Sequence, residues 1–412
     1  MMLQRLRAFD LTDQNGYLCG KILADLGVDV IKVERPEGDP GRNTGAYWGD
    51  DPNPEKSIYW FAYNTNKRGI TLNIESADGK KIFKDLVAKS DFVIESFPPG
   101  YMENLGLGYP ALSKIKKSII VTSITPFGQT GPYSGYQATD IVVTGMAGVL
   151  YQNGDPTRPP VNMSVPQSPL LAGADGAVGT MLAYYHREAT GEGQHVDVSM
   201  QQSTAWFQAN AVPMWELNKA ILRRAGAARS GTSRDDTGQR QMWLCKDGYV
   251  FFVVIGGKQG AKALRALVEW MNDEGKATDF LKSVDWNNFD MWKATREVIG
   301  QINKPVADFF LLHTKKEILS ESTKRHISIC PLSSMQDLVN DENLRARNFW
   351  KKVEHPVLKT TIEYPSEFIR SSEVSLETRF RAPLIGEHND EVYQEIGLSR
   401  QDLVTLKGAG II

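Results

Sequence analysis

Residues 7–33 read RAFDLTDQNGYLCGKILADLGVDVIKV, and this stretch decides the fold. A short strand is expected at Arg7-Ala8-Phe9. From Gly16 to Leu26 the apolar side chains recur at helical spacing, and residues 28–33 alternate between apolar and polar as a β-strand does. A strand, a helix and a second strand in this order predict a β-α-β unit.

A second round of the same pattern follows. Strands are expected at 70–74, 92–94 and 119–122, with a helix over 79–89. This alternation predicts an α/β fold with a parallel sheet and helices on both faces. The first turn, Thr12 to Gly16, lacks GxGxxG, and residues 256–262 lack the spacing of a P-loop. A nicotinamide dehydrogenase and a P-loop nucleotide site are therefore disfavoured.

The composition changes near the middle of the chain. Residues 222–240 are basic and rich in Gly and Ser, which is typical of a solvated linker. We expect a large domain over 1–221 before this linker and a smaller α+β domain over 241–330 after it. The smaller domain should contain a hairpin of 241–244 with 249–255, helices over 261–271, 291–301 and 306–312, and a capping-box helix start at Thr314.

Charge and composition exclude several classes of protein. Lys and Arg number 47 against 49 Asp and Glu, a net charge of −2 that offers no field for nucleic acid or an anionic membrane. The three cysteines form no CxxC pair, and the six histidines have no zinc-ligand spacing, so we expect reduced thiols and no metal site. No apolar run reaches about 18 residues, and the first ten residues have no apolar h-region. A cytoplasmic protein is predicted.

One carboxylate stands among unusually small neighbours. The segment Gly173-Ala174-Asp175-Gly176-Ala177 is followed by an apolar helical pattern. An Asp at the start of a helix is usually a cap that accepts a free backbone N–H. Small neighbours also let a ligand come close, and an unshielded carboxylate can act as a covalent nucleophile. Both interpretations of Asp175 stay open on spacing alone.

Seven motifs in order along the chain resemble those of the class III CoA-transferases, a family that also contains the α-methylacyl-CoA racemases. They are LGVDVIKVERP (26–36), NKRGITL (66–72), ESFPPG (95–100), FGQTGPY (127–133), TGEGQHVDV (190–198), LRAR (344–347) and GEH (386–388). The resemblance implies a Rossmann-like large domain completed by residues 331–412, a small domain between, and an interlocked dimer.

The resemblance also implies a mechanism. An Asp at the position of Asp175 is the catalytic nucleophile: it attacks an acyl-CoA thioester to give a mixed anhydride, and CoA then returns to form an aspartyl-CoA thioester that an acceptor acid attacks. Coenzyme A and acyl-CoA are substrates, and no tightly bound cofactor or metal is implied.

The resemblance assigns the contacts with CoA to five short segments. They are Gln14 and Asn15, whose roles could be exchanged; Arg35; Leu72, Asn73, Ile74 and Glu75; Ser96, Phe97 and Pro98; and Gln137, Ala138, Thr139 and Asp140. Each also has an ordinary alternative: Arg35 could be a surface ion pair, Lys67 and Arg68 a solvated turn, and Phe97 core. Asn104 departs from the Arg that many members carry there. Gly256 and Gly257 resemble a mobile active-site loop, or else form a simple strand-to-helix turn.

Alternative activities are weighed on one pair of residues. Racemases of this family use a His before an Asp, whereas this chain has Thr139-Asp140, and Thr does not move protons near neutrality. This favours CoA transfer over a racemase, while an intramolecular CoA-transferring isomerase and a CoA-binding subunit of a heteromer stay open. Aromatic residues cluster at 47–48, 59–61, 206–207 and 215, which is compatible with a bulky or aromatic acid, although such residues more often belong to the core or to a dimer interface. The resemblance suggests a benzylsuccinate-type CoA-transferase with succinyl-CoA as donor. The partner is expected to be a second copy or a paralogous subunit.

Overall fold

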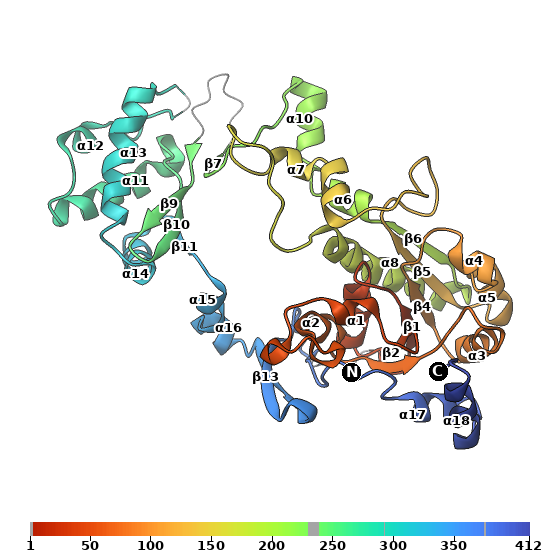
Figure 1. The fold of residues 1–412 in the computed structure, drawn as a ribbon. Helices are drawn as coiled ribbons and strands as arrows, with labels where there is room; N and C mark the ends of the chain where they lie inside the picture. Colours follow the sequence, from red (N-terminus) through yellow and green to blue (C-terminus); the bar gives the residue numbers. More distant parts are fainter. Residues whose placement is uncertain (1–2, 230–238, 292, 375) are drawn as a thin grey trace. The chain divides into compact units, whose positions relative to one another are not determined.

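The computed structural model describes residues 3–229, 239–291, 293–374 and 376–412 (Figure 1). Its contacts divide the chain into two compact units. Unit 1 comprises Met1–Val149, Met163–Ala209 and Glu342–Ile412, and unit 2 comprises Leu150–Asn162 and Asn210–Asp341. These limits differ from the domain limits at 221 and 331, which stay a prediction. Of the expected linker, residues 230–238 lie outside the described residues.

Unit 1 contains a six-stranded sheet of order β3-β2-β1-β4-β5-β6, in which every neighbouring pair is parallel. The strands are β1 (Arg7–Leu11), β2 (Asp29–Glu34), β3 (Arg68–Thr71), β4 (Phe92–Glu95), β5 (Ile120–Thr125) and β6 (His195–Ser199). The predicted β-α-β unit and parallel sheet are confirmed. β3 ends at Thr71 instead of residue 74, because the carboxamide of Asn73 accepts the N–H of Glu75 and turns the chain into the next helix.

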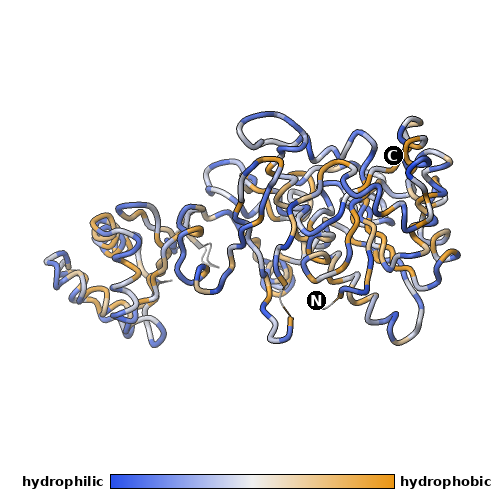
Figure 2. Tube along the Cα trace, turned by 90° about the horizontal axis from the view of Figure 1, so that it is seen from below, coloured by the Kyte–Doolittle hydropathy of each residue, from blue (hydrophilic) through white to orange (hydrophobic). Residues whose placement is uncertain are grey.

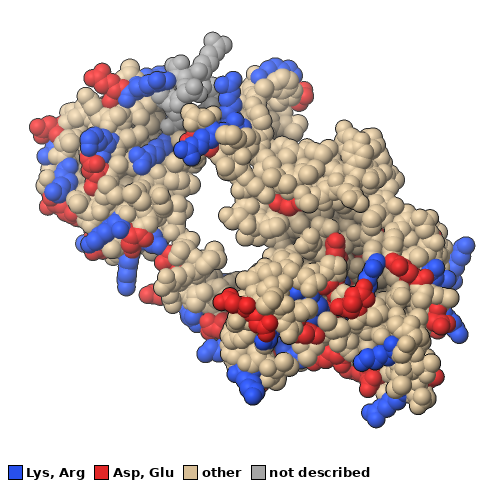
Figure 3. Space-filling view, viewed as in Figure 1, with Lys and Arg blue, Asp and Glu red and all other residues tan. Residues whose placement is uncertain are grey.

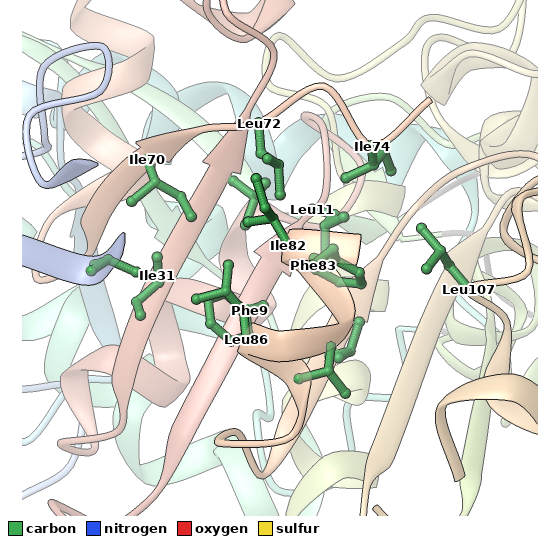
Figure 4. Close-up of a cluster of buried hydrophobic side chains, with 14 of the residues drawn as sticks. Phe9, Leu11, Ile31, Ile70, Leu72, Ile74, Ile82, Phe83, Leu86 and Leu107 are labelled. Atoms are coloured by element: carbon green, nitrogen blue, oxygen red, sulfur yellow. The ribbon is translucent and has the colours of Figure 1, made fainter. Parts of the chain in front are cut away.

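Helices cover both faces of this sheet (Figure 1). One face packs against the cluster that includes Cys19, Leu23, Ile124 and Ala172, contributed by α1 (Tyr17–Asp25), β5 and α8 (Ser168–Thr190). The other packs against α3 (Ala77–Val87) through the cluster that includes Phe9, Ile82 and Phe83 (Figure 4). The chain's last helices add Tyr393 to this cluster. Figure 2 shows hydrophobic segments of the chain running through the part of the molecule in which both termini lie. The helices of unit 1 are α1 (Tyr17–Asp25), α2 (Ile58–Asn64), α3 (Ala77–Val87), α4 (Tyr101–Leu105), α5 (Tyr109–Ile115), α6 (Asp140–Met146), α8 (Ser168–Thr190), α9 (Met200–Trp206), α16 (Glu342–Ala346), α17 (Asn389–Gln394) and α18 (Arg400–Gly408).

The end of the chain returns to the large unit. A hairpin of β12 (Trp350–His355) and β13 (Thr360–Pro365) precedes α17. The N–H of His388 donates to the carbonyl of Gly69 (2.9 Å), and the N–H of Asn73 donates to the carbonyl of Ile411 (2.7 Å). These bonds attach the last residues to β3 and to the turn that follows it.

Unit 2 contains an antiparallel sheet of order β11-β10-β9. Its strands are β9 (Met242–Cys245), β10 (Gly248–Phe252) and β11 (Ile329–Leu332), and a short pair of β7 (Ala228–Arg229) and β8 (Gln239–Arg240) precedes them. The hairpin and the capping box at Thr314 are confirmed. The helices are α7 (Val149–Gln152), α10 (Ala211–Asn218), α11 (Gly257–Asp273), α12 (Asp279–Ser283), α13 (Arg296–Phe310), α14 (Lys315–Arg325) and α15 (Met335–Val339).

The two helices expected at 291–301 and 306–312 are wrong, because α13 is one helix that passes through Pro305. Thr295 caps its first turn by accepting the N–H of Val298 at 3.3 Å. Ile302, Val306 and Phe309 are buried on either side of the proline. This continuous apolar face offsets the one helical hydrogen bond that a proline removes.

Among the described residues, no helix is both long and apolar enough to cross a membrane. In the same part of the chain, no group of three or more His, Cys, Asp and Glu side chains is arranged to hold a metal ion.

Candidate active site

The sheet has a switch point between β1 and β4. Strands β2 and β3 extend from β1 in one direction, while β5 and β6 extend from β4 in the other. In open parallel sheets, the loops after two such strands diverge and leave a crevice at the carboxyl ends, where ligands bind. The loops that follow β1 and β4 contain Gln14, Asn15, Ser96, Phe97 and Pro98, all expected to contact CoA.

Asp13 connects the two loops across the switch point. Its N–H donates to Ser96 Oγ, and Ser96 Oγ donates to Asp13 Oδ1, both at 2.8 Å. The same carboxylate accepts the N–H of Asn15 (2.9 Å) and its Nδ2 (3.2 Å). Asn15 is thus committed to the loop, while Gln14 is exposed and its side chain has no hydrogen bond to any described residue. Gln14 is therefore the better placed of the two to meet a ligand.

A buried charge cluster supports the first of these loops from below. Lys67 Nζ donates to Asp10 Oδ2 at 2.8 Å, and Asp10 Oδ1 accepts the N–H of Thr12 at 3.0 Å. Burial alone would raise the pKa of Asp10, but the charges of Lys67 and Lys32 outweigh it and lower that pKa. The interpretation of Lys67 as part of a solvated turn is wrong, because its side chain is fully buried.

A second group gathers residues that follow β2, β3 and β4. Arg35 Nη2 donates to Glu75 Oε1 at 3.0 Å, and the hydroxyl of Tyr101 donates to the same oxygen at 2.6 Å. The ring of Tyr101 stacks on Phe97, with centroids 4.5 Å apart and planes 26° apart. Arg35 and Glu75 are 59% and 51% exposed, so their ion pair is weak and easily released. The sequence motifs did not identify Tyr101 as a candidate site residue, although it directly follows the ESFPPG motif.

The segment 72–75 divides between core and surface. The side chains of Leu72 and Ile74 point into the cluster with Leu11 and Ile82 (Figure 4). The N–H of Leu72 donates to the carbonyl of Glu34, and that of Asn73 to Ile411. Glu75 is the exposed side chain of this segment. A CoA contact by these four residues stays a prediction.

Asp140 is engaged in supporting another helix. Its Oδ1 accepts the N–H of Gln167, the N–H of Ser168 and the hydroxyl of Ser168, each at 2.9 Å. Ser168 is the first residue of α8, so Asp140 supplies the cap that Gln167 does not. Gln137 and Thr139 are exposed, and Ala138 packs against the core. CoA contacts here stay predicted, with the carboxylate of Asp140 already committed.

Asp175 lies within α8, seven residues after Ser168, so its interpretation as a helix cap is wrong. Its side chain is exposed and makes no hydrogen bond or ion pair with a described residue. The neighbouring glycines have a packing role: a Cβ on Gly173 would lie 2.9 Å from Leu18 Cβ, and one on Gly176 would lie 2.9 Å from Ile124 Cδ1. They let α8 approach α1 and β5 closely, while Asp175 stays outside that contact.

The direction of α8 places Asp175 near the crevice end of the sheet. Gly176 packs against Ile124, close to the carboxyl end of β5. Further along, Thr180 bonds to Thr122 (2.7 Å), and Arg187 bonds to Asp91, before β4 begins (3.1 Å). The helix therefore runs from the carboxyl edge to the amino edge. Asp175 shares the carboxyl edge with the loops that contain Asp13 and Ser96.

Gly256 and Gly257 belong to unit 2, at the start of α11. A Cβ on Gly256 would lie 2.2 Å from the carbonyl oxygen of Phe289, and Gly257 has φ +70°. Both positions need glycine for the local turn from β10 into α11. Coverage of an active site by this loop stays a prediction.

Comparisons with known proteins match nearly the whole chain to one family of proteins. A family model described as CoA-transferase family III matches residues 7–389. Succinyl-CoA:(R)-benzylsuccinate CoA-transferase subunit BbsE of Thauera aromatica is 30% identical, with 99% of this chain and 97% of that protein covered. Succinyl-CoA–L-malate CoA-transferase β subunit of Chloroflexus aurantiacus is 28% identical, with 96% and 94% covered. The crystal structure of a CAIB/BAIF family protein from Brucella suis shares the fold, with a TM-score of 0.80, 24% identity, and 95% and 98% covered.

Proposed function

The chain belongs to CoA-transferase family III, and we propose that it moves CoA from a donor thioester to an acceptor carboxylic acid with Asp175 as the covalent nucleophile. One observation carries the proposal: Asp175 is an exposed carboxylate without a partner among the described residues, at the carboxyl edge of a parallel sheet. A carboxylate that is engaged elsewhere, as Asp140 is, could not attack without first breaking its hydrogen bonds.

The proposed reaction balances without a redox step. An Asp175 oxygen attacks the carbonyl carbon of the donor thioester, the C–S bond breaks, and CoA leaves as a thiolate from an acyl-aspartyl anhydride. The thiolate attacks the Asp175 carbonyl and releases the donor acid, which leaves an aspartyl-CoA thioester. The acceptor carboxylate then displaces CoA to form a second anhydride, and the thiolate attacks its acyl carbon. This last step releases the new acyl-CoA and restores the Asp175 carboxylate.

CoA binding is proposed in the crevice beside these loops. Its adenine would pack on the stacked rings of Phe97 and Tyr101, and a phosphate would replace Glu75 as the partner of Arg35. Asn104 is exposed and uncharged at the position where the resemblance implies an Arg. Arg35 is therefore the cation of the predicted set on which phosphate binding would rely.

Succinyl-CoA is the proposed donor, and an aromatic succinate such as benzylsuccinate is the proposed acceptor. The support is the relative from Thauera aromatica, whose name contains both compounds. Of the aromatic residues, Trp60 and Phe61 are buried in the core, whereas Trp48, Trp206, Phe207 and Trp215 are exposed. The exposed aromatic residues could contact a bulky acid or a partner subunit.

A partner subunit is proposed on the outer face of α8. Val178, Leu182 and Tyr185 recur at helical spacing and are 58%, 66% and 79% exposed. The surface of unit 1 over α6 and α8 carries few charged side chains (Figure 3). Exposed apolar surface of this kind is typical of protein–protein interfaces. The partner is a second copy of this chain or a paralogous subunit, as the subunit names of both relatives suggest.

The racemase alternative gains no support from the site. Thr139 has no group that exchanges protons near neutrality, and the carboxylate of Asp140 already accepts three hydrogen bonds.

Trapping the covalent intermediate tests the proposal. Purified protein is incubated with succinyl-CoA, treated with hydroxylamine or borohydride, and digested for mass spectrometry. We expect a hydroxamate or a reduced alcohol at Asp175, and neither in Asp175→Asn. Transfer activity with Asp175 unmodified would refute the nucleophile. Folded protein without activity or adduct leads to the same experiment after co-expression with a paralogue.

A further inference from the structure

Three polar side chains form a row on one face of the sheet, close to its carboxyl edge. Glu95 ends β4 and pairs in register with Ser123 of β5, which pairs with Asp197 of β6. Ser123 Oγ lies 2.9 Å from Nε2 of His195 on the same strand as Asp197. Glu95 is only 4% exposed. The proposed transfer chemistry uses none of these groups.

Glu95 lies directly beneath the loop expected to bind CoA. Its Oε2 accepts the backbone N–H of Phe97 at 2.7 Å. Ser123, which pairs with Glu95 in register, lowers the pKa of the Glu95 carboxyl group. The intervening residue, Ser96, is tied to Asp13 of the loop after β1. Glu95 therefore holds the backbone of Phe97 in place from within the protein. The ring of Phe97 stacks on Tyr101.

We propose that Glu95 is a positioning residue for the acyl-CoA site, and that the charge on its carboxylate sets how firmly Phe97 is held for CoA. This role rests on the proposed function. It adds that the ionisation of Glu95 controls the affinity of the site for CoA. Glu95 does not touch the reacting atoms, so it acts on CoA binding and not on the transfer steps.

The surroundings of Glu95 keep both of its protonation states accessible. Burial raises the pKa of Glu95 to about 7, opposed by the hydrogen bonds from Ser123 and Phe97 and reinforced by the charges of Glu103 and Asp13. Asp13 faces it from the loop after β1, and Glu103 faces it from α4. A carboxylate accepts an N–H more strongly than a carboxylic acid does. Protonation therefore weakens the hold on Phe97.

His195 lies beside this row as a neutral group. Burial lowers the pKa of His195, against the opposite effect of Asp197 and Glu103, and the ring of Tyr109 on α5 stacks on it at 6.0 Å. If the Ser123 hydroxyl donates to ionised Glu95, its oxygen is left to accept from Nε2–H of His195, which lies 2.9 Å away. The neutral imidazole thus orients Ser123 without adding a charge beside Glu95.

Isothermal titration of the full-length protein with free coenzyme A, at pH values from 6 to 8.5, tests this role. For wild type we expect the Kd to be about fivefold higher on the acid side of neutrality, from the weaker hydrogen bond. The ionisation of CoA itself changes the Kd equally in both proteins and is subtracted. After this correction, Glu95→Gln should bind CoA weakly, with a Kd that does not change with pH. Ser123→Ala removes a group that lowers the pKa of Glu95. The midpoint of the pH dependence of the Kd should therefore move to higher pH in this variant.

The outcomes separate this inference from the proposed function. Glu188→Gln is the matched control, since Glu188 is exposed without an ion pair to any described residue, and it should behave as wild type. CoA binding with the same pH dependence in wild type and Glu95→Gln would overturn the role, as would a change in kcat at constant KM. Failure of CoA to bind at every pH would instead contradict the proposed function. If Glu95→Gln does not fold, Ser123→Ala carries the test, and an unmoved midpoint counts against the proposal.

Discussion

Asp140 and Ser168 join two helices end to end: Asp140 Oδ1 accepts both the N–H and the hydroxyl of Ser168 at 2.9 Å. Asp140 is the first residue of α6, and Ser168 is the first residue of α8, which carries Asp175. A residue expected to contact CoA thus fixes the start of the helix that presents the proposed nucleophile.

Replacing Asp140 by Ala should therefore affect stability more than substrate affinity. Loss of the cap should lower the free energy of unfolding by about 1–3 kcal/mol, measured in urea. The KM for succinyl-CoA should change by less than about twofold, because the carboxylate is already occupied. Ser168→Ala, which removes one of the three bonds, should cost less. A large rise in KM at unchanged stability would show that Asp140 contacts CoA instead.

Asp175→Asn should abolish transfer and leave the fold intact. An exposed side chain without a partner contributes little to stability, so the midpoint of urea unfolding should not move. The kcat should fall by at least about a thousandfold, because the amide cannot form the anhydride. Asp85→Asn, on the exposed side of α3, is the control and should keep full activity. Substantial turnover by Asp175→Asn would exclude the covalent mechanism.

Tyr101→Ala should raise the KM for succinyl-CoA about three- to tenfold, since one side of the proposed adenine site is lost. Tyr101→Phe keeps the stack on Phe97 and loses only the bond to Glu75, so its KM should stay near that of wild type. Glu75→Gln frees Arg35 and should lower the KM. Steady-state kinetics of the three variants measure these KM values. Equal KM values for Tyr101→Ala and Tyr101→Phe would show that the Tyr101 ring does not contact CoA.

Lys67→Met should destabilise the protein by about 3–5 kcal/mol, because it leaves the buried Asp10 without its partner. The pH dependence has a definite sign. The folded pKa of Asp10 is lowered from 3.8, so its stabilisation is complete above that value and is lost as the pH falls through the folded pKa. Urea unfolding between pH 3 and 7 should show this acid loss in wild type and a smaller one in Asp10→Asn. The same loss of stability at acid pH in wild type and Asp10→Asn would contradict this role of Asp10.

Leu182→Asp should reduce the assembled mass measured by light scattering, since it places a charge in the apolar stripe on α8. Val404→Asp is the matched control, because Val404 is also 66% exposed but lies on α18, away from the stripe. An unchanged mass for Leu182→Asp would place any subunit interface elsewhere.

The sequence by itself determined the parallel α/β sheet, the hairpin of unit 2 and the family. These follow from local periodicity and from motifs that are contiguous in the chain, such as residues 7–33 and 95–100. It also drew attention to Asp175, but for a reason that the structure changes: the glycines beside it serve the contact between α8 and α1.

Only the tertiary structure decided which side chains are committed and which are available. Asp140 and Ser168 are 28 residues apart, Asp13 and Ser96 are 83 apart, and Lys67 and Asp10 are 57 apart. No period or spacing encodes such pairs, because folding brings the carboxyl ends of separate strands to one edge of the sheet. The same physics explains Glu95, which reads as one more charged residue in the sequence and becomes a buried carboxylate only when β4 and β5 pair in register.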